Sequence, residues 1–98
     1  MSTPSKEHEI LLESTLDISH VETLHQQLEE ALVDGHRVTM DASNIEKIDT
    51  AALQIILAFV QQAEKQSLNF TWKFPSKIFI DYAKMLGLTE KLKLPKTM

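Results

Sequence analysis

Segments with strand-like patterns alternate with segments that have helix-like patterns along this chain. We expect strands over 9–18, 37–42 and 69–74, and helices over 19–35, 49–66 and 76–87. Parallel strands need long connections, and helices that fill such connections make right-handed crossovers. The order strand–helix repeated three times therefore predicts an α/β domain in which helices pack on a mainly parallel sheet.

The first strand shows a period of two. Ile10, Leu12, Leu16 and Ile18 occupy even positions, so their side chains share one face, and we expect a kink near Ser14. The preceding residues are polar. We expect 1–8 to form a flexible N-terminus and 9–98 to form one domain, since 98 residues suit a single core.

The first helix has signals at both ends. Ser19 is a good N-cap residue, and Glu22 three positions later completes a capping box. Apolar residues then recur at helical spacing from Val21 to Leu32. Gly35 suits the left-handed residue that ends a helix.

The segment 37–42 is short and β-branched, with Val38 and Met40 on one face, and it predicts a central strand. The connecting loop 43–49 contains Ile45 and Ile48 as apolar anchors. Either Asp49 or Thr50 caps the long helix that follows, which we expect to end near residue 66.

The third strand is expected to have one buried aromatic face, formed by Phe70, Trp72 and Phe74. Pro75 ends this strand, and Ser76 caps the next helix. The apolar side of that helix consists of Ile78, Phe79, Tyr82, Ala83 and Leu86, and Gly87 ends it. A short final turn from Thr89 would contain Leu92 and Leu94.

Composition argues against several classes of protein. The formal charge is −4 and the basic residues are scattered, whereas a nucleic-acid-binding protein usually has a basic face. The apolar stretch 51–60 is too short to span or insert into a membrane, and the first residues contain no secretory signal. Cysteine is absent, which excludes disulfides and zinc thiolates. We expect a cytoplasmic protein.

Residues that would converge in an active site are not evident. The histidines at 8, 20, 25 and 36 lack the four-residue spacing of a helical metal site. Glu29 and Glu30 suit a solvated helix face. Gly35 and Gly87 are the only glycines, so neither a phosphate-binding loop nor a G-x-S-x-G turn is possible. We therefore expect no enzyme activity, no metal and no cofactor.

The helix over 49–66 divides into three strips when each residue is rotated by about 100° from the last. The core strip contains Ala52, Leu53, Ile56, Leu57, Phe59, Val60 and Ala63, and the polar strip contains Gln54, Gln61 and Lys65. A third strip contains Ala51, Ile55, Ala58 and Gln62. This strip is either an ordinary helix surface or a flat surface of small residues against which a partner packs. The pattern alone leaves both interpretations open.

The stretch DASNIEKIDTAAL resembles the signature of STAS domains, the family that includes bacterial anti-sigma factor antagonists. The residues that carry the resemblance are Asp41, Ser43, Ile48, Asp49, Thr50, Ala51, Ala52 and Leu53. The flanking segments also resemble the family, so that the similarity covers nearly the whole chain after residue 9. It implies a STAS-like fold, with a mixed, mainly parallel sheet of about four strands and three to four helices.

The resemblance also implies a function. In regulated members, a partner kinase phosphorylates a serine at the helix start, and the added charge of about −2 breaks the complex. Ala51 occupies that position here, so this switch is missing. The neighbouring Thr50 has a hydroxyl, for which we favour helix capping over phosphorylation.

The Asp-Thr-Ala form is similar to two subgroups of the family. One contains stand-alone proteins of chemotaxis-type signalling clusters, and the other contains the STAS subunit of a lipid-transporting ABC system, whose threonine contributes to the ATPase interface. The Leu-Gln continuation and Trp72 favour the first. We expect docking onto an anti-sigma, histidine-kinase-like or chemosensory protein, or alternatively an ABC ATPase. The expected docking residues are Ser43, Asn44, Asp49, Thr50, Ala51, Ile55, Ala58 and Gln62.

Overall fold

The computed structural model describes residues 7–34 and 37–94, and it confirms the alternation of strands and helices. The elements in chain order are β1 (Glu7–Leu11), β2 (Thr15–Leu16), the 3₁₀ helix η1 (Ile18–His20), α1 (Val21–Asp34), β3 (Arg37–Asp41), β4 (Lys47–Ile48), α2 (Thr50–Lys65), β5 (Asn69–Lys73) and α3 (Lys77–Met85). Strand β1 thus includes residues 7 and 8, which we had assigned to the flexible start.

The strands form two separate parallel sheets rather than one continuous sheet. β3 lies between β1 and β5, and Val38 pairs with His8 on one side and Phe70 on the other. The two-residue strands β2 and β4 pair separately. The expected kink near Ser14 separates β2 from β1, and the carbonyl of Ser14 accepts hydrogen bonds from the amides of Glu46 and Lys47. The STAS-type α/β class is confirmed, and every strand pairing in the described ranges is parallel.

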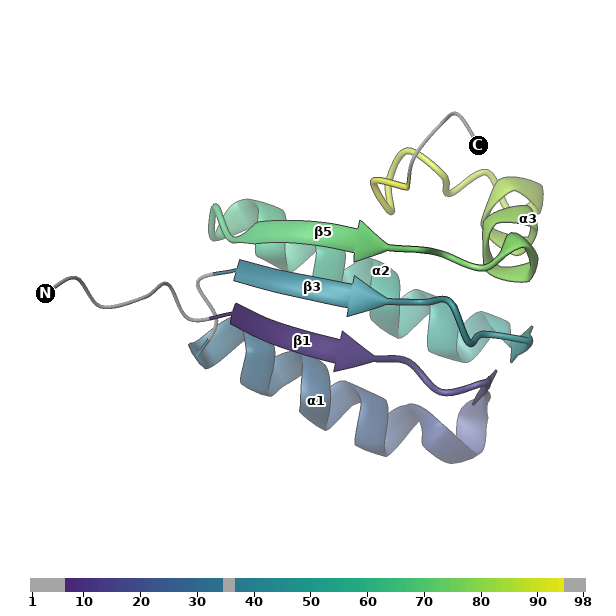
Figure 1. The fold of residues 1–98 in the computed structure, drawn as a ribbon, viewed down its shortest axis with the longest axis horizontal. Helices are drawn as coiled ribbons and strands as arrows, with labels where there is room; N and C mark the ends of the chain where they lie inside the picture. The colour runs from purple at the N-terminus through teal and green to yellow at the C-terminus, as the bar shows by residue number, and fades with distance from the viewer. Residues whose placement is uncertain (1–6, 35–36, 95–98) are drawn as a thin grey trace, which may run out of the picture.

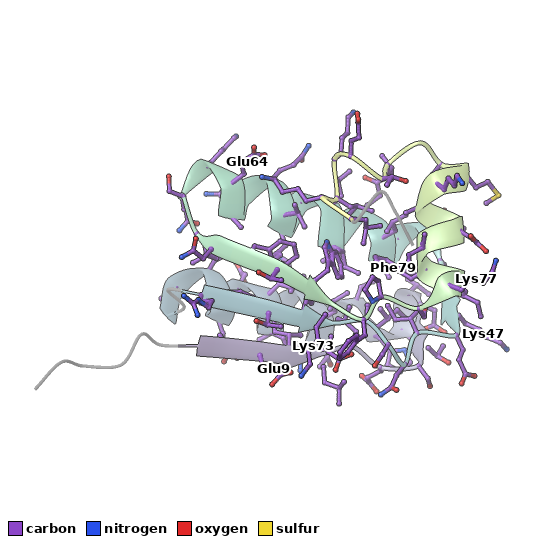
Figure 2. The ribbon with its side chains drawn as sticks, turned by 45° about the horizontal axis from the view of Figure 1, so that its top comes forward. Glu9, Lys47, Glu64, Lys73, Lys77 and Phe79 are labelled. Carbon is purple, nitrogen blue, oxygen red and sulfur yellow. The ribbon has the colours of Figure 1, made fainter. Side chains whose placement is uncertain are left out.

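The molecule has two layers (Figure 1). Helices α1 and α2 pack against each other on one face of the three-stranded sheet, and α3 lies beyond the carboxyl ends of the strands. The opposite face of the sheet carries exposed polar side chains such as Thr71. On this face Lys73 Nζ lies 3.1 Å from Glu9 Oε2, so an ion pair links β5 to β1 (Figure 2).

The core lies between the sheet and the helices. Val38 and Met40 of the central strand are fully buried, as expected. The α2 residues predicted to face the core are buried, except Leu57, which is half-buried. Trp72 contacts Phe79 of α3 at a ring-centroid distance of 5.0 Å. This contact joins the third strand to the last helix.

The last described residues, up to Leu94, pack onto the core through a turn. Trp72 Nε1 donates a hydrogen bond of 2.7 Å to the carbonyl of Leu92, and both Leu92 and Leu94 are buried. Gly87 has a φ of 72°, a conformation that favours glycine, and it follows the last turn of α3. The final turn was therefore predicted correctly from its two leucines.

The start of the first helix differs from the prediction. Asp17, not Ser19, caps the helical segment, because its Oδ1 accepts hydrogen bonds from the Ser19 amide at 3.0 Å and the Ser19 hydroxyl at 2.6 Å. A 3₁₀ turn therefore precedes α1, which begins at Val21. The end of α1 at Asp34 agrees with the expected boundary, while Gly35 lies outside the described residues.

The aromatic alternation of β5 stops one residue before the expected end. Phe74 has a φ of 48° and is 72% exposed, so it does not belong to the buried face. Pro75 disfavours right-handed helical geometry at the residue before it, and the left-handed backbone turns the Phe74 side chain away from the alternation. Ile78 of α3 and Leu86, which follows α3 directly, are also partly exposed rather than buried.

Candidate docking site

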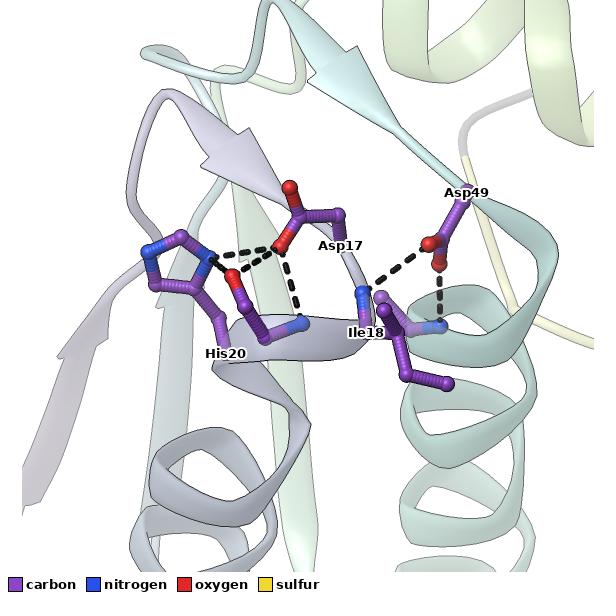
Figure 3. Close-up of polar contacts among 6 residues, drawn as sticks. Asp17, Ile18, His20 and Asp49 are labelled. Atoms are coloured by element: carbon purple, nitrogen blue, oxygen red, sulfur yellow. Dashed lines mark hydrogen bonds and ion pairs between the residues drawn. The ribbon is translucent and has the colours of Figure 1, made fainter.

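Asp49 sets the start of α2. Its Oδ1 accepts a hydrogen bond of 2.9 Å from the Ala52 amide, and its Oδ2 accepts one of 3.0 Å from the Ile18 amide (Figure 3). One carboxylate therefore caps α2 and joins it to η1. Of the two capping candidates in the sequence, Asp49 is the cap.

Thr50 has a different contact. Its hydroxyl shares a hydrogen bond of 2.8 Å with the phenolic oxygen of Tyr82, and the threonine itself is exposed. The preference for Thr50 as a capping residue was wrong, because Asp49 already fills that role one position earlier. The Thr50 hydroxyl instead connects the start of α2 to α3.

The third strip of α2 is accessible. Ala51 and Ile55 are half-buried, whereas Ala58 and Gln62 are exposed. None of these four is sealed beneath the chain's own loops. The strip continues from the helix start towards its middle, as the helical periodicity predicts.

The loop before α2 is shaped by a local turn. Asp41 Oδ1 accepts hydrogen bonds from the Ser43 amide at 2.9 Å and the Ser43 hydroxyl at 2.6 Å. These hydrogen bonds, the side-chain one above all, lower the pKa of the Asp41 carboxyl because they favour its charged form. Ser43 and Asn44 are exposed beside this turn.

Two grooves lie beside the helices. A groove of about 340 Å³ lies between α1 and α2, and Ile55 and Ala58 contribute to its lining. A second groove of about 440 Å³ lies between β4 and α3 and is lined in part by Ile78, Tyr82 and Met85. No α3 residue is among the docking residues expected from the sequence. Met85 is not on the apolar side expected for this helix, and it is 71% exposed.

Ser19, His20 and Asp17 also meet, next to the α2 start (Figure 3). His20 Nδ1 lies 2.9 Å from Asp17 Oδ1 and 3.2 Å from the Ser19 oxygen. Ser19 donates to the carboxylate, and these contacts lower the pKa of Asp17. The side chains of Ser19 and His20 both contact the same carboxylate oxygen of Asp17 at the start of a helical segment. Helix capping therefore accounts for this cluster.

Within residues 7–34 and 37–94, no group of three or more His, Asp or Glu side chains is placed to hold a metal ion. In the same ranges, no helix combines the length and the apolar character that crossing a bilayer requires.

The geometry thus defines an α/β domain with an accessible helix start beside a short shaped loop. The family model described as "Mlab, STAS domain" matches residues 1–95. The chain therefore belongs to the STAS domain family, which confirms the resemblance seen in the signature around Asp49. Comparison with curated proteins finds no match. STAS domains are in general binding or regulatory domains rather than enzymes.

The predicted site residues fall into two neighbouring groups. Ser43, Asn44, Asp49, Thr50 and Ala51 lie on the loop and at the start of α2. The remaining three, Ile55, Ala58 and Gln62, follow along α2 at helical spacing. Local periodicity could not show that Tyr82 and Ile18 bond to this region, because they lie 32 and 31 residues away from their partners.

Proposed function

We propose that this chain is a non-enzymatic docking module that binds a regulatory protein through the start of α2. The observation that carries the proposal is the accessible strip beginning at Ala51, next to the exposed Thr50. A partner can approach closely because Ala51 and Ala58 are small. STAS domains commonly interact with protein partners, which supports this interpretation.

The helix start offers polar interactions as well as a flat surface. Amide groups in the first turn of a helix lack partners within the helix, and the helix dipole places positive charge there. The Asp49 carboxylate binds the Ala52 amide and leaves the first two residues of the helix, Thr50 and Ala51, at the surface. An acidic or amide side chain of the partner fits this position.

We propose that docking is not switched by a phosphoserine, since Ala51 has no hydroxyl. Thr50 is the hydroxyl residue at this end of α2, and it is exposed. Phosphate on Thr50 would add a charge of about −2 and break the bond to Tyr82. If Thr50 is phosphorylated in protein isolated with its partner kinase, the phosphorylation switch lies at position 50 rather than at position 51.

The partner that we propose is a signalling protein of the histidine-kinase-like, anti-sigma or chemosensory kind. The test compares Ala51→Glu with Gln61→Glu, which adds the same charge at an exposed position of the same helix. We expect Ala51→Glu to abolish capture of the purified partner, while Gln61→Glu retains it and both variants unfold in urea like the parent. Equal capture by both variants contradicts the proposal.

A second candidate function is that of an accessory subunit of an ABC-type lipid transporter. The observation that favours it is the exposed Thr50 hydroxyl, held towards α3 by Tyr82. If the partner is the ABC ATPase, Thr50→Ala should weaken binding and Thr50→Ser should restore it. If the partner is a signalling protein that recognises the Ala51 strip and makes no contact with the Thr50 hydroxyl, Thr50→Ala should leave binding within about twofold, as for an ordinary surface substitution.

A further inference from the structure

The groove between α1 and α2 has an apolar floor. Its lining residues are His25, Leu28, Glu29 and Leu32 from α1, and Gln54, Ile55, Ala58 and Phe59 from α2. Leu28 and Phe59 are buried at the bottom, whereas Ala58 is exposed and adds little bulk. The groove therefore offers apolar contact to a segment that can approach the helices closely.

Two hydrogen bonds join α2 and its flanking residues to the η1–α1 segment, one near each end of α2. The Asp49 carboxylate binds the Ile18 amide near the start of α2. Near the other end, Gln66 Nε2 donates a hydrogen bond of 3.4 Å to the carbonyl of Leu32. The strip from Ala51 to Gln62 has a length of about 16 Å at 1.5 Å per residue, which matches about three turns of a helix.

The lining of this groove contains one carboxylate, Glu29 on the α1 side, and no charged residue on the α2 side. Helix α1 contains Glu22, Glu29, Glu30 and Asp34, and the sequence has neither Lys nor Arg between Lys6 and Arg37. Helix α2 has no charged residue from Thr50 to Ala63. Glu29 lies 3.8 Å from His25 on the rim, and both side chains are exposed.

We infer that this groove receives a basic amphipathic helix of the partner protein. The inference rests on the proposed function, because the strip that begins at Ala51 continues into the groove. An apolar face of the incoming helix would contact Ile55 and Ala58, and its Lys or Arg side chains would face Glu29 across the α1 rim. A helix is the fitting element because the walls are helices, which expose no strand edge for an extended segment.

The test uses synthetic peptides of about 14 residues, long enough for the three turns plus fraying ends. Three peptides share one Leu/Ala face and carry Lys, Gln or Glu on the other face. Binding is measured by fluorescence anisotropy, and amide chemical shifts of the labelled protein locate it. We expect the Lys peptide to bind at least tenfold more tightly than the Glu peptide and to shift the amides of Ile55 and Ala58.

Two variants of α1 provide the matched control. Glu29→Lys and Glu30→Lys make the same change in charge on the same helix, and both positions are exposed, but only Glu29 lines the groove. We expect Glu29→Lys to weaken binding of the Lys peptide about three- to tenfold, the range for one exposed charge contact and its reversal. Glu30→Lys should weaken it less than twofold. Ala58→Trp, which fills the groove from an exposed position, should abolish binding.

Several outcomes would overturn the inference. They are equal affinity for all three peptides, equal loss with Glu29→Lys and Glu30→Lys, shifts confined to residues outside the groove, and no binding at millimolar peptide. A dimer of the parent protein that Ala58→Trp dissociates would assign the groove to a second copy of the chain. Because this experiment uses no native partner, its failure leaves the comparison of Ala51→Glu with Gln61→Glu as an independent test of the proposed function.

Discussion

At the scale of single residues, Asp49 has the most consequential contacts. Each of its carboxylate oxygens accepts a hydrogen bond from a different element, one from the Ala52 amide in α2 and one from the Ile18 amide in η1. A side chain that caps a helix satisfies one of its unpaired amides. The second bond fixes where the docking helix begins relative to α1.

Replacing the Asp49 carboxylate should lower the free energy of unfolding, and the loss should grow with the number of hydrogen bonds removed. We expect Asp49→Ala to lower the free energy of unfolding by about 1–2 kcal/mol, since it removes the cap and leaves the Ile18 amide without its acceptor. Asp49→Asn keeps one acceptor oxygen and should cost less. Urea denaturation of both variants checks this, and a larger loss for Asn than for Ala would show that the cap is not the cause.

Asp41 provides a prediction for pH dependence. Its hydrogen bonds from Ser43 lower its pKa from the ordinary value of 3.8, so the folded state favours the charged carboxylate. The stabilisation is present above the unfolded pKa and is lost as the pH falls through the lower, folded pKa. Because Asp41 is only half-buried, solvent screens its interactions and the effect on global stability is small.

A carboxyl titration followed by NMR therefore gives the cleaner measurement. We expect the pKa of Asp41 to lie below 3.8 in the parent protein and to rise towards 3.8 in Ser43→Ala. This variant removes the side-chain donor, which is the largest cause of the shift, but keeps the backbone amide donor. An unchanged pKa in Ser43→Ala would assign the shift to another group.

At the scale of elements, the sequence predicted most boundaries because the signals are local. The period of two in the strands and the helical spacing in α2 depend on neighbours within a few residues. The prediction failed where another local geometry was equally possible. Asp17 took the cap that Ser19 could have filled, and the left-handed Phe74 interrupted an alternation that its residue type would have continued.

The candidate site was predictable only in part, because sequence patterns report on residues that are close together in the chain. The signature around Asp49 locates the start of α2, and the helical periodicity of α2 locates its third strip. They contain no information on Tyr82, because its bond to Thr50 joins residues on separate elements. The groove likewise depends on how α1 packs against α2, which the pattern of either helix alone does not determine.

Helix α3 packs into the core through the buried side chains of Phe79 and Ala83, of which Phe79 is by far the larger. Phe79 is fully buried and contacts Trp72, whereas the adjacent Ile78 is 49% exposed. We expect Phe79→Ala to lower the free energy of unfolding by about 3–5 kcal/mol, the usual cost of removing a buried aromatic ring. Ile78→Ala should cost less than about 1 kcal/mol. Urea denaturation distinguishes the two, and similar losses would mean that α3 packs differently.

At the scale of the whole molecule, the two layers leave two unlike surfaces. The helical face contains the α2 start, its strip of small residues and the apolar groove. The open face of the sheet is polar, and the Glu9–Lys73 ion pair crosses it (Figure 2). Interfaces between proteins are centred on apolar, desolvated contacts, which the helical face supplies and the sheet face does not.

Introducing the same residue on each surface tests this division. We expect Ala51→Arg to weaken partner binding more than tenfold, since the large side chain separates surfaces that must pack closely at the centre of the interface. Thr71→Arg places an arginine on an exposed position of β5, on the open sheet face, and should leave the affinity within about twofold. Urea denaturation first checks that both variants have the same unfolding midpoint as the parent. Isothermal titration calorimetry with the purified partner then measures the affinity of each variant. A loss with Thr71→Arg and none with Ala51→Arg would place the interface on the sheet, where the partner would have to displace or pair with the charges of Glu9 and Lys73.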